Sequence, residues 1–197
     1  MTGPITHLPK FIADKAAILE RVGIESAAAE IEWILCHVLE VDRLNLYLHG
    51  TELLNEERIG RIDRIIEQRT TRFPLQYILE ESWFYGRKFF VSPSVMVPTP
   101  ETELLCENAI KFLSQRQIQC PRILDVGVGS GVIAVTMALE VPSSHVVALD
   151  ISPEALAVAR RNAAQLCRSF RIEFRQSNFF AAARENERFD LILSNPP

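Results

Sequence analysis

Apolar residues recur every three or four positions along the first part of the chain, up to about Arg72. This spacing places them on one face of an α-helix. Two stripes stand out: Ile31, Ile34, Leu35, Val38 and Leu39 form one, and Ile59, Ile62, Ile65 and Ile66 form the other. The pattern predicts a domain of several short helices over residues 1–73, with no catalytic constellation among them.

Local signals mark where these helices begin and end. Gly23 and Gly50 fall just past periodic segments, where a helix would stop. Asn55, followed by Glu56 and Glu57, supplies the capping side chain and the early acids that are typical of a helix start.

The composition changes after this domain. Aromatic residues and valine cluster over residues 83–91 around Gly86, which predicts a β-hairpin. Pro98 and Pro100 then stiffen an extended segment, because the residue before a proline is pushed away from helical geometry. We therefore expect residues 74–100 to form a linker.

From residue 101 onwards, strand and helix patterns alternate. The expected strands are 122–126, 145–150, 171–176 and 189–194, and the expected helices are about 101–114, 132–140 and 153–166. Strands that alternate with helices indicate a parallel sheet covered on both faces. Residues 101–197 are thus expected to form an α/β domain.

Composition narrows the class of protein. The chain has 197 residues, of which 48% are hydrophobic and 23% charged, and its formal net charge is −4. This mild acidity argues against direct binding of nucleic acid. The 4 cysteines form no CxxC pair, so we expect reduced thiols and no metal site. Prolines and an acid interrupt the N-terminus, and no apolar run reaches the length of a bilayer; we expect a cytoplasmic protein without membrane contact.

The first candidate for chemistry is a glycine turn after the strand at 122–126, with the sequence Asp125-Val126-Gly127-Val128-Gly129-Ser130-Gly131. Glycines at alternate positions let the backbone turn sharply and approach a ligand closely. A dinucleotide fingerprint would need glycine where Val132 stands. The missing glycine and the acid at Asp125 favour S-adenosylmethionine; a tight loop without a ligand is the alternative.

Asp150 ends the second strand of this domain. A carboxylate at this distance from a glycine turn can accept hydrogen bonds from both ribose hydroxyls of an adenosine cofactor, with a turn or capping role as the alternative. After the third strand, Asn178 and Phe179 offer an amide and an aromatic ring that could flank the adenine. There the alternative is a phenylalanine in the core and an asparagine in a turn.

The most informative motif is Asn195-Pro196-Pro197, which follows the fourth strand. A carboxamide nitrogen is a poor nucleophile because its lone pair is delocalised into the carbonyl. The Asn195 side-chain oxygen and the Pro196 carbonyl could accept the two N–H hydrogens of a substrate amide, and the prolines hold the turn rigid. Such contacts orient the nitrogen toward a methyl donor and stabilise the charge that develops on it.

Together these motifs resemble the HemK-like family, the protein-(glutamine-N(5)) methyltransferases that act on peptide chain release factors. The resemblance covers essentially the whole chain and includes Pro74-Leu75-Gln76-Tyr77-Ile78, Phe84-Tyr85-Gly86, Val97-Pro98 with Pro100-Glu101-Thr102-Glu103, and Asp150-Ile151-Ser152-Pro153-Glu154-Ala155-Leu156. It implies a Rossmann-like class I S-adenosylmethionine-dependent methyltransferase domain, preceded by a small all-α domain that recognises the substrate. The implied reaction methylates the glutamine of a Gly-Gly-Gln motif and serves translation termination.

The resemblance also assigns roles to residues. Asn195 and Pro196 are implied to be catalytic, and together with Pro197 they would hold the substrate glutamine. The implied cofactor-binding residues are Asp125, Val126, Gly127, Val128, Gly129, Asp150, Phe179 and Asn195. The expected partner is a release factor as protein substrate, and we expect a monomer.

The sequence departs from the family pattern at several positions. The family usually has arginine at Thr99, glycine at Glu80, threonine or cysteine at Val128, and aspartate at Asn178. The departures at Val128 and Asn178 could weaken cofactor binding. The family also continues beyond Pro197 with an aromatic residue and further strands, so we expect this chain to be a fragment of the enzyme.

Two other functions stay open. The Asn-Pro-Pro turn alone is shared with adenine-specific DNA methyltransferases, whose exocyclic amine poses the same chemical problem. Such an enzyme would need a basic groove or a target-recognition segment, and neither is visible in the sequence. The second alternative is an inactive fragment that binds a partner through its helical domain, against which the retained cofactor residues argue.

Overall fold

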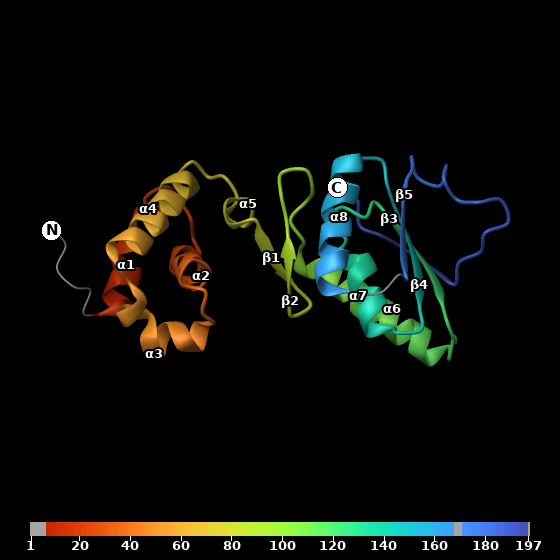
Figure 1. Ribbon diagram of the computed structural model, residues 1–197, viewed down its shortest axis with the longest axis horizontal. Helices are drawn as coiled ribbons and strands as arrows, with labels where there is room; N and C mark the ends of the chain where they lie inside the picture. The colour runs from red at the N-terminus through yellow and green to blue at the C-terminus, as the bar shows by residue number, and fades with distance from the viewer. Residues whose placement is uncertain (1–6, 168–170, 197) are drawn as a thin grey trace. The chain divides into compact units, whose positions relative to one another are not determined.

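The computed structural model describes residues 7–167 and 171–196, and the chain divides into two compact units between Leu79 and Glu80. The first unit is helical, and the second is built around a parallel sheet (Figure 1). They are called the helical unit and the sheet unit below. None of the helices within the two described ranges is long and apolar enough to cross a membrane.

The helical unit contains α1 (Leu8–Glu20), α2 (Ala27–Leu39), α3 (Arg43–Leu53), α4 (Glu56–Thr70) and α5 (Leu75–Leu79). Every member of the first predicted stripe is buried in α2, and Ile62 and Ile66 of the second stripe are buried in α4. Asn55 caps α4 as predicted, because its side-chain oxygen accepts a hydrogen bond from the Arg58 N–H at 2.9 Å. The core of this unit therefore contains all of the first stripe but only part of the second, because Ile59 and Ile65 are half-buried.

The predicted helix end at Gly50 is wrong. Gly50 lies inside α3, which Asp42 caps by accepting a hydrogen bond from the Asn45 N–H at 2.7 Å. A Cβ atom at Gly50 would come within 2.8 Å of the Leu46 side chain, which is fully buried. The glycine makes room for this leucine and does not end the helix. Gly23, in contrast, does follow the end of α1.

The sheet unit begins with a hairpin of β1 (Glu81–Phe84) and β2 (Arg87–Phe90). Its parallel sheet contains β3 (Arg122–Val126), β4 (His145–Asp150), β5 (Ile172–Gln176) and β6 (Leu191–Ser194), in the spatial order β5-β4-β3-β6. The helices are α6 (Pro100–Gln115), α7 (Val132–Glu140) and α8 (Pro153–Leu166). Each neighbouring pair of strands in this sheet is parallel, as the alternating pattern predicts.

The two faces of the parallel sheet are covered differently. Helices α6, α7 and α8 pack on one face, in a core that includes Ile123 and Ala148 (Figure 1). The opposite face buries a smaller cluster against which Phe189 packs; its members are Leu124, Val126, Val147 and Leu149. Phe189 belongs to the segment between β5 and β6, which has neither helix nor strand. Irregular chain thus covers the face where the sequence pattern suggested a helix.

The expected linker, residues 74–100, is shared between the two units. Helix α5 belongs to the helical unit, whereas Phe84 and Phe89 of the hairpin are buried in the core of the sheet unit. The buried side chain of Asn162 in α8 accepts a hydrogen bond from the Phe90 N–H at 2.8 Å and donates to the Ser130 carbonyl at 2.8 Å. The hairpin is thereby tied to the glycine turn. The domain boundaries at 73 and 100 stay predictions.

Glu80 lies immediately before the hairpin with φ = 55°. This left-handed region favours glycine, because a side chain there crowds the following carbonyl oxygen. The family pattern that this sequence resembles usually has glycine at the same position. The backbone geometry gives the physical reason for that preference.

Candidate active site

A cavity of about 350 Å³ lies at the carboxyl ends of β3, β4 and β6, within the sheet unit. Its size is within the range of small-molecule sites, and its position follows the rule for open α/β sheets. The lining comes from the glycine turn after β3, the end of β4, the start of the β5–β6 segment, and Asn195 with Pro196 after β6. The motifs that the sequence singled out therefore meet at one edge of the sheet.

The glycine turn is shaped for close approach of a ligand. Gly127, Gly129 and Gly131 have φ values of 78°, 51° and 85°, which disfavour any side chain. The Gly127 N–H donates to the Leu149 carbonyl at 2.9 Å, which fastens the turn to the end of β4. A Cβ atom at Gly127 would meet nothing within 4 Å. All four predicted residues at 126–129 line the cavity.

Asp150 stands at the end of β4 and lines the cavity, where its carboxylate is held from two sides. The Gly129 N–H donates to Oδ2 at 2.9 Å, and the Ser152 N–H donates to Oδ1 at 3.0 Å. A carboxylate has about four acceptor positions, so each oxygen can accept a further hydrogen bond. The predicted cap of α8 is also present, because the Ser152 side chain accepts from the Ala155 N–H at 3.0 Å. Asp150 is thus fixed by its neighbours and retains capacity for a diol.

Asp125 does not line the cavity. Its side chain is fully buried beneath α7, where Oδ2 accepts a hydrogen bond from the Ala134 N–H at 3.1 Å. Among the described residues its Oδ1 atom has no hydrogen-bond partner. Burial raises the pKa of this carboxyl to about 7, against the effect of the Ala134 hydrogen bond, and the charge of Asp150 raises it further. The structure therefore separates Asp125 from the other predicted cofactor residues.

Asn178 and Phe179 lie at the rim of the cavity. Phe179 is 69% exposed, so it is not the core phenylalanine of the alternative reading, and its ring is free to contact a ligand. Its backbone has φ = 48°, and the Ser177 hydroxyl donates to its carbonyl at 2.7 Å. This hydrogen bond helps to hold a conformation that is unfavourable for a residue with a side chain.

Asn195 and Pro196 line the cavity directly after β6, whereas Pro197 lies outside the described residues. The Asn195 side chain donates from Nδ2 to the Thr102 hydroxyl at 2.6 Å. Thr102 is buried in the first turn of α6 and is only 3% exposed. Because the nitrogen end of the amide is engaged, the oxygen Oδ1 remains available to accept hydrogen bonds from a ligand.

Some cavity residues were not foreseen from the sequence. Thr102 belongs to a segment that resembles a family signature. Nothing in the sequence, however, indicates that it contacts Asn195. Val95, Met96 and Pro98 are apolar residues of the cavity lining, and no pattern in the sequence indicated that they would contact a ligand. Within residues 7–167 and 171–196 there is no group of three or more potential metal ligands.

Comparison with known proteins gives two matches to family models. The model described as "PrmC N-terminal domain" matches residues 12–79, and the one described as "Methyltransferase small domain" matches residues 102–197. The chain is 42% identical to the release factor glutamine methyltransferase of Koribacter versatilis over 179 residues, which cover 91% of this chain and 62% of that protein. The corresponding enzyme of Geobacter sulfurreducens is 39% identical, with 91% of this chain and 61% of that protein covered. The chain is therefore similar to release factor glutamine methyltransferases over about nine tenths of its own length.

This similarity to release factor glutamine methyltransferases confirms the resemblance seen in the sequence. It also confirms the fold class, in which a helical region precedes a class I S-adenosylmethionine-dependent methyltransferase domain. The two matched ranges lie on either side of the hairpin, which spans Glu81–Phe90. The chain spans 62% and 61% of the length of the two release factor glutamine methyltransferases named above.

Proposed function

We propose that this chain is part of an enzyme that transfers a methyl group from S-adenosylmethionine to a glutamine side-chain amide in a peptide chain release factor. The glutamine is that of the Gly-Gly-Gln motif. The observation that carries the proposal is the common cavity, which the glycine turn, Asp150 and the Asn195-Pro196 turn all line. The names of the relatives support the choice of substrate.

The residues around the cavity suit S-adenosylmethionine. Gly127 leaves open space where a side chain would fill the cavity, and Asp150 keeps acceptor capacity for two ribose hydroxyls. Phe179 offers an exposed ring to the adenine, and Val126 and Val128 add apolar lining to the cavity. When bound, the cofactor supplies an electrophilic methyl group. Asp125 would act on this site indirectly, through its hydrogen bond to α7.

The task of the protein side chains is then to orient a weak nucleophile. Oδ1 of Asn195 and the carbonyl of Pro196 accept the two N–H hydrogens of the glutamine amide. Thr102 supports this arrangement because it engages Nδ2 of Asn195 at 2.6 Å, so that the acceptor end of the amide faces the substrate. The two acceptors direct the nitrogen and stabilise the positive charge that develops on it. The methylated nitrogen is strongly acidic and loses its proton without a general base.

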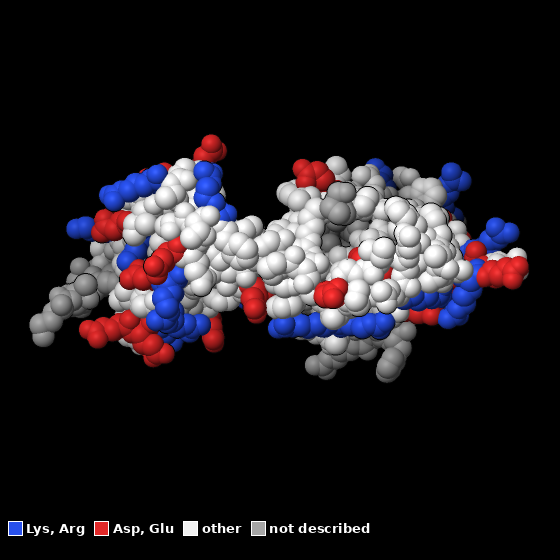
Figure 2. Space-filling view, turned by 90° about the horizontal axis from the view of Figure 1, so that it is seen from above, with Lys and Arg blue, Asp and Glu red and all other residues white. Residues whose placement is uncertain are grey.

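The distribution of charge favours a protein substrate over a nucleic acid. Figure 2 shows Lys and Arg interspersed with Asp and Glu over the helical unit. In the same view the middle of the sheet unit carries few charged side chains, and basic residues stand toward its edges. Among the described residues on this face there is no broad basic area of the kind that phosphate backbones require.

The test uses the full-length protein, S-adenosylmethionine with a labelled methyl group, and a purified release factor. We expect mass spectrometry of the digested release factor to find one added methyl group on the glutamine of its Gly-Gly-Gln motif. A release factor with that glutamine replaced by asparagine serves as the control and should stay unlabelled. Transfer to an adenine-containing oligonucleotide, without transfer to the release factor, would contradict the proposal.

A further inference from the structure

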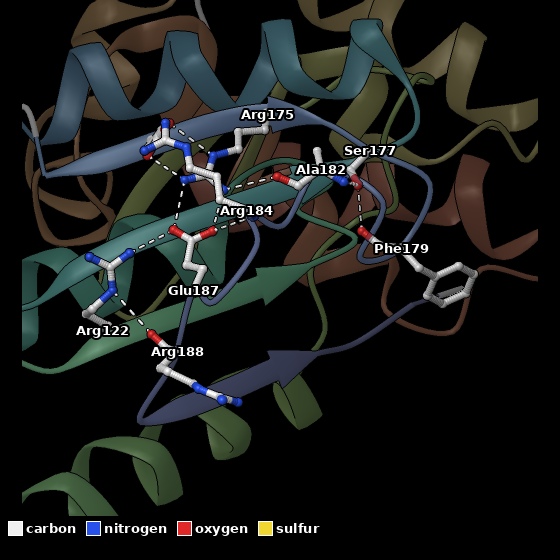
Figure 3. A network of polar contacts seen from close by, with 9 residues as sticks. Arg122, Arg175, Ser177, Phe179, Ala182, Arg184, Glu187 and Arg188 are labelled. Carbon is white, nitrogen blue, oxygen red and sulfur yellow. Dashed lines mark hydrogen bonds and ion pairs between the residues drawn. The ribbon is translucent and has the colours of Figure 1, made fainter.

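The segment between β5 and β6, residues 177–190, has neither helix nor strand, yet its first three residues line the cavity. Backbone hydrogen bonds hold its turns, and one from the Asp190 N–H to the Arg122 carbonyl joins its end to β3. Figure 3 shows that a network of side-chain contacts also joins this segment to β3 and β5. The centre of the network is the ion pair between Arg175 of β5 and Glu187.

This ion pair is largely shielded from solvent and has the geometry of a strong one. The two side chains are 11% and 5% exposed, and parallel hydrogen bonds of 2.7 and 3.0 Å join the guanidinium to the two carboxylate oxygens. Arg122 of β3 donates to Glu187 at 2.7 Å, and the Arg184 N–H donates to it at 3.1 Å. The hydrogen bonds from Arg175 lower the pKa of Glu187 to about 2, so this carboxylate is charged at neutral pH.

A continuous series of hydrogen bonds leads from the ion pair to the cavity (Figure 3). Arg175 donates to the Ala182 carbonyl at 3.1 Å, and the Ala182 N–H donates to the Ser177 hydroxyl oxygen at 2.9 Å. Ser177, which is buried, donates in turn to the carbonyl of Phe179 at 2.7 Å. Phe179 is the exposed aromatic residue with φ = 48° at the rim. The conformation at the rim thus depends on contacts that begin outside the cavity.

We propose that Arg175 and Glu187 are positioning residues for the cofactor. They hold residues 177–187 in the conformation that presents Phe179 to the adenosine part of the ligand. Neither residue lines the cavity, so the effect is indirect. Without the ion pair the segment populates other conformations, and the apparent affinity falls in proportion to the population that can bind. The inference rests on the proposed function, because it requires an adenosine-containing cofactor in this cavity.

The test compares Glu187→Gln with the wild type by calorimetric titration of the full-length protein with S-adenosylhomocysteine. Glutamine keeps the shape of the side chain but removes its charge and one of its two acceptor oxygens. If about one molecule in ten keeps the competent conformation, Kd rises roughly tenfold. In steady-state assays we expect KM for S-adenosylmethionine to rise while kcat at saturating cofactor stays unchanged. Amide hydrogen exchange of residues 177–187 should be faster in the ligand-free variant.

Arg184→Gln is the matched control. The Arg184 side chain lies on the same segment and pairs with Glu173, but the two side chains are 70% and 46% exposed. Such exposed pairs contribute little, and the Arg184 N–H bond to Glu187 survives the substitution. We expect an unchanged Kd for this control. Arg175→Lys is a second, milder variant in case Glu187→Gln does not fold. Lysine keeps the charge but cannot make both hydrogen bonds to Glu187 together with the one to the Ala182 carbonyl. Kd should therefore rise for this variant too.

Two results would overturn the inference. One is a Kd for Glu187→Gln or Arg175→Lys equal to that of the wild type, even with a lower Tm, because the ion pair would then serve stability alone. The other is a fall in kcat at saturating cofactor with KM unchanged. Absence of S-adenosylhomocysteine binding by the wild-type protein would instead refute the proposed function itself.

Discussion

Replacement of Gly131 by alanine should lower the free energy of unfolding by about 2–5 kcal/mol. Gly131 has φ = 85°, a region in which a residue with a side chain costs about 1–2 kcal/mol. The added Cβ atom would lie 3.0 Å from the Cβ and 3.1 Å from the Cα of Ala159 in α8. Overpacking of this kind costs about 1–3 kcal/mol more, and no rotamer change can relieve it because the contacts involve backbone and Cβ atoms.

Gly127→Ala is the matched substitution in the same turn. Gly127 has φ = 78°, so the backbone cost is again about 1–2 kcal/mol, but a Cβ atom there would meet nothing within 4 Å. Because Gly127 lines the cavity, the new methyl group would take up space that the ligand needs. We expect Gly127→Ala to lose only the backbone contribution of about 1–2 kcal/mol in stability, and most of its affinity for S-adenosylhomocysteine.

Urea unfolding of the ligand-free variants and calorimetric titration, both at a temperature where the proteins are folded, measure the two effects separately. Equal stability losses in Gly131→Ala and Gly127→Ala would refute the contact argument, because only Gly131 faces Ala159. Wild-type affinity in Gly127→Ala would place the ligand away from the glycine turn.

Substitutions at four further positions address other parts of the site. Asn195→Ala should abolish methyl transfer and leave cofactor affinity nearly intact; equal loss of both would remove the assigned role. Thr102→Val should lower kcat through loss of the 2.6 Å contact with Asn195, and Thr102→Ser, which keeps the hydroxyl, should restore it. Asp150→Ala should weaken S-adenosylhomocysteine binding by about 1–3 kcal/mol, as expected for a lost charged hydrogen bond, and an unchanged Kd would exclude Asp150 from the site. The pKa of Asp125 is raised in the folded protein from 3.8 to about 7, so the folded state binds more protons and ligand-free stability should fall as pH rises through that interval. Asp125→Asn should flatten this part of the stability curve measured by thermal unfolding; an unchanged slope would contradict it.

Features that depend on a few neighbouring residues were predicted from the sequence. Asn55 and Ser152 cap their helices, because a cap needs only a short polar side chain and the next turn of chain. The expected helix end at Gly50 was wrong because the glycine serves packing. It makes space for the buried Leu46 side chain within α3. The cover on the second sheet face also depends on packing, since Phe189, expected as the first residue of the fourth strand, lies before β6 and packs against the cluster on that face.

The same difference between local features and distant packing applies to the candidate site. The glycine turn and Asp150 line one cavity as the sequence predicts, because the strand ends of a parallel sheet meet at one edge. Their role in cofactor binding stays a prediction. Thr102 was missed because its partner, Asn195, is 93 residues away, and only the packing of α6 brings the two together. The side chain of Asp125 lies beneath α7 and outside the cavity lining, and its expected role in cofactor binding stays a prediction.

Different kinds of contact hold the two ends of the cavity, at Asn195 and at Phe179. Substitutions near the two ends should therefore have different effects. Asn195 directly follows β6, which pairs with β3, and its side chain is anchored to α6 through Thr102. Changes there disturb the sheet and the orientation of the substrate amide together. Phe179, at the other end, lies in the segment 177–190, which has no regular secondary structure. Its conformation depends on hydrogen bonds that start at Arg175 of β5. Changes in that segment should therefore adjust cofactor affinity without altering the methyl-transfer end.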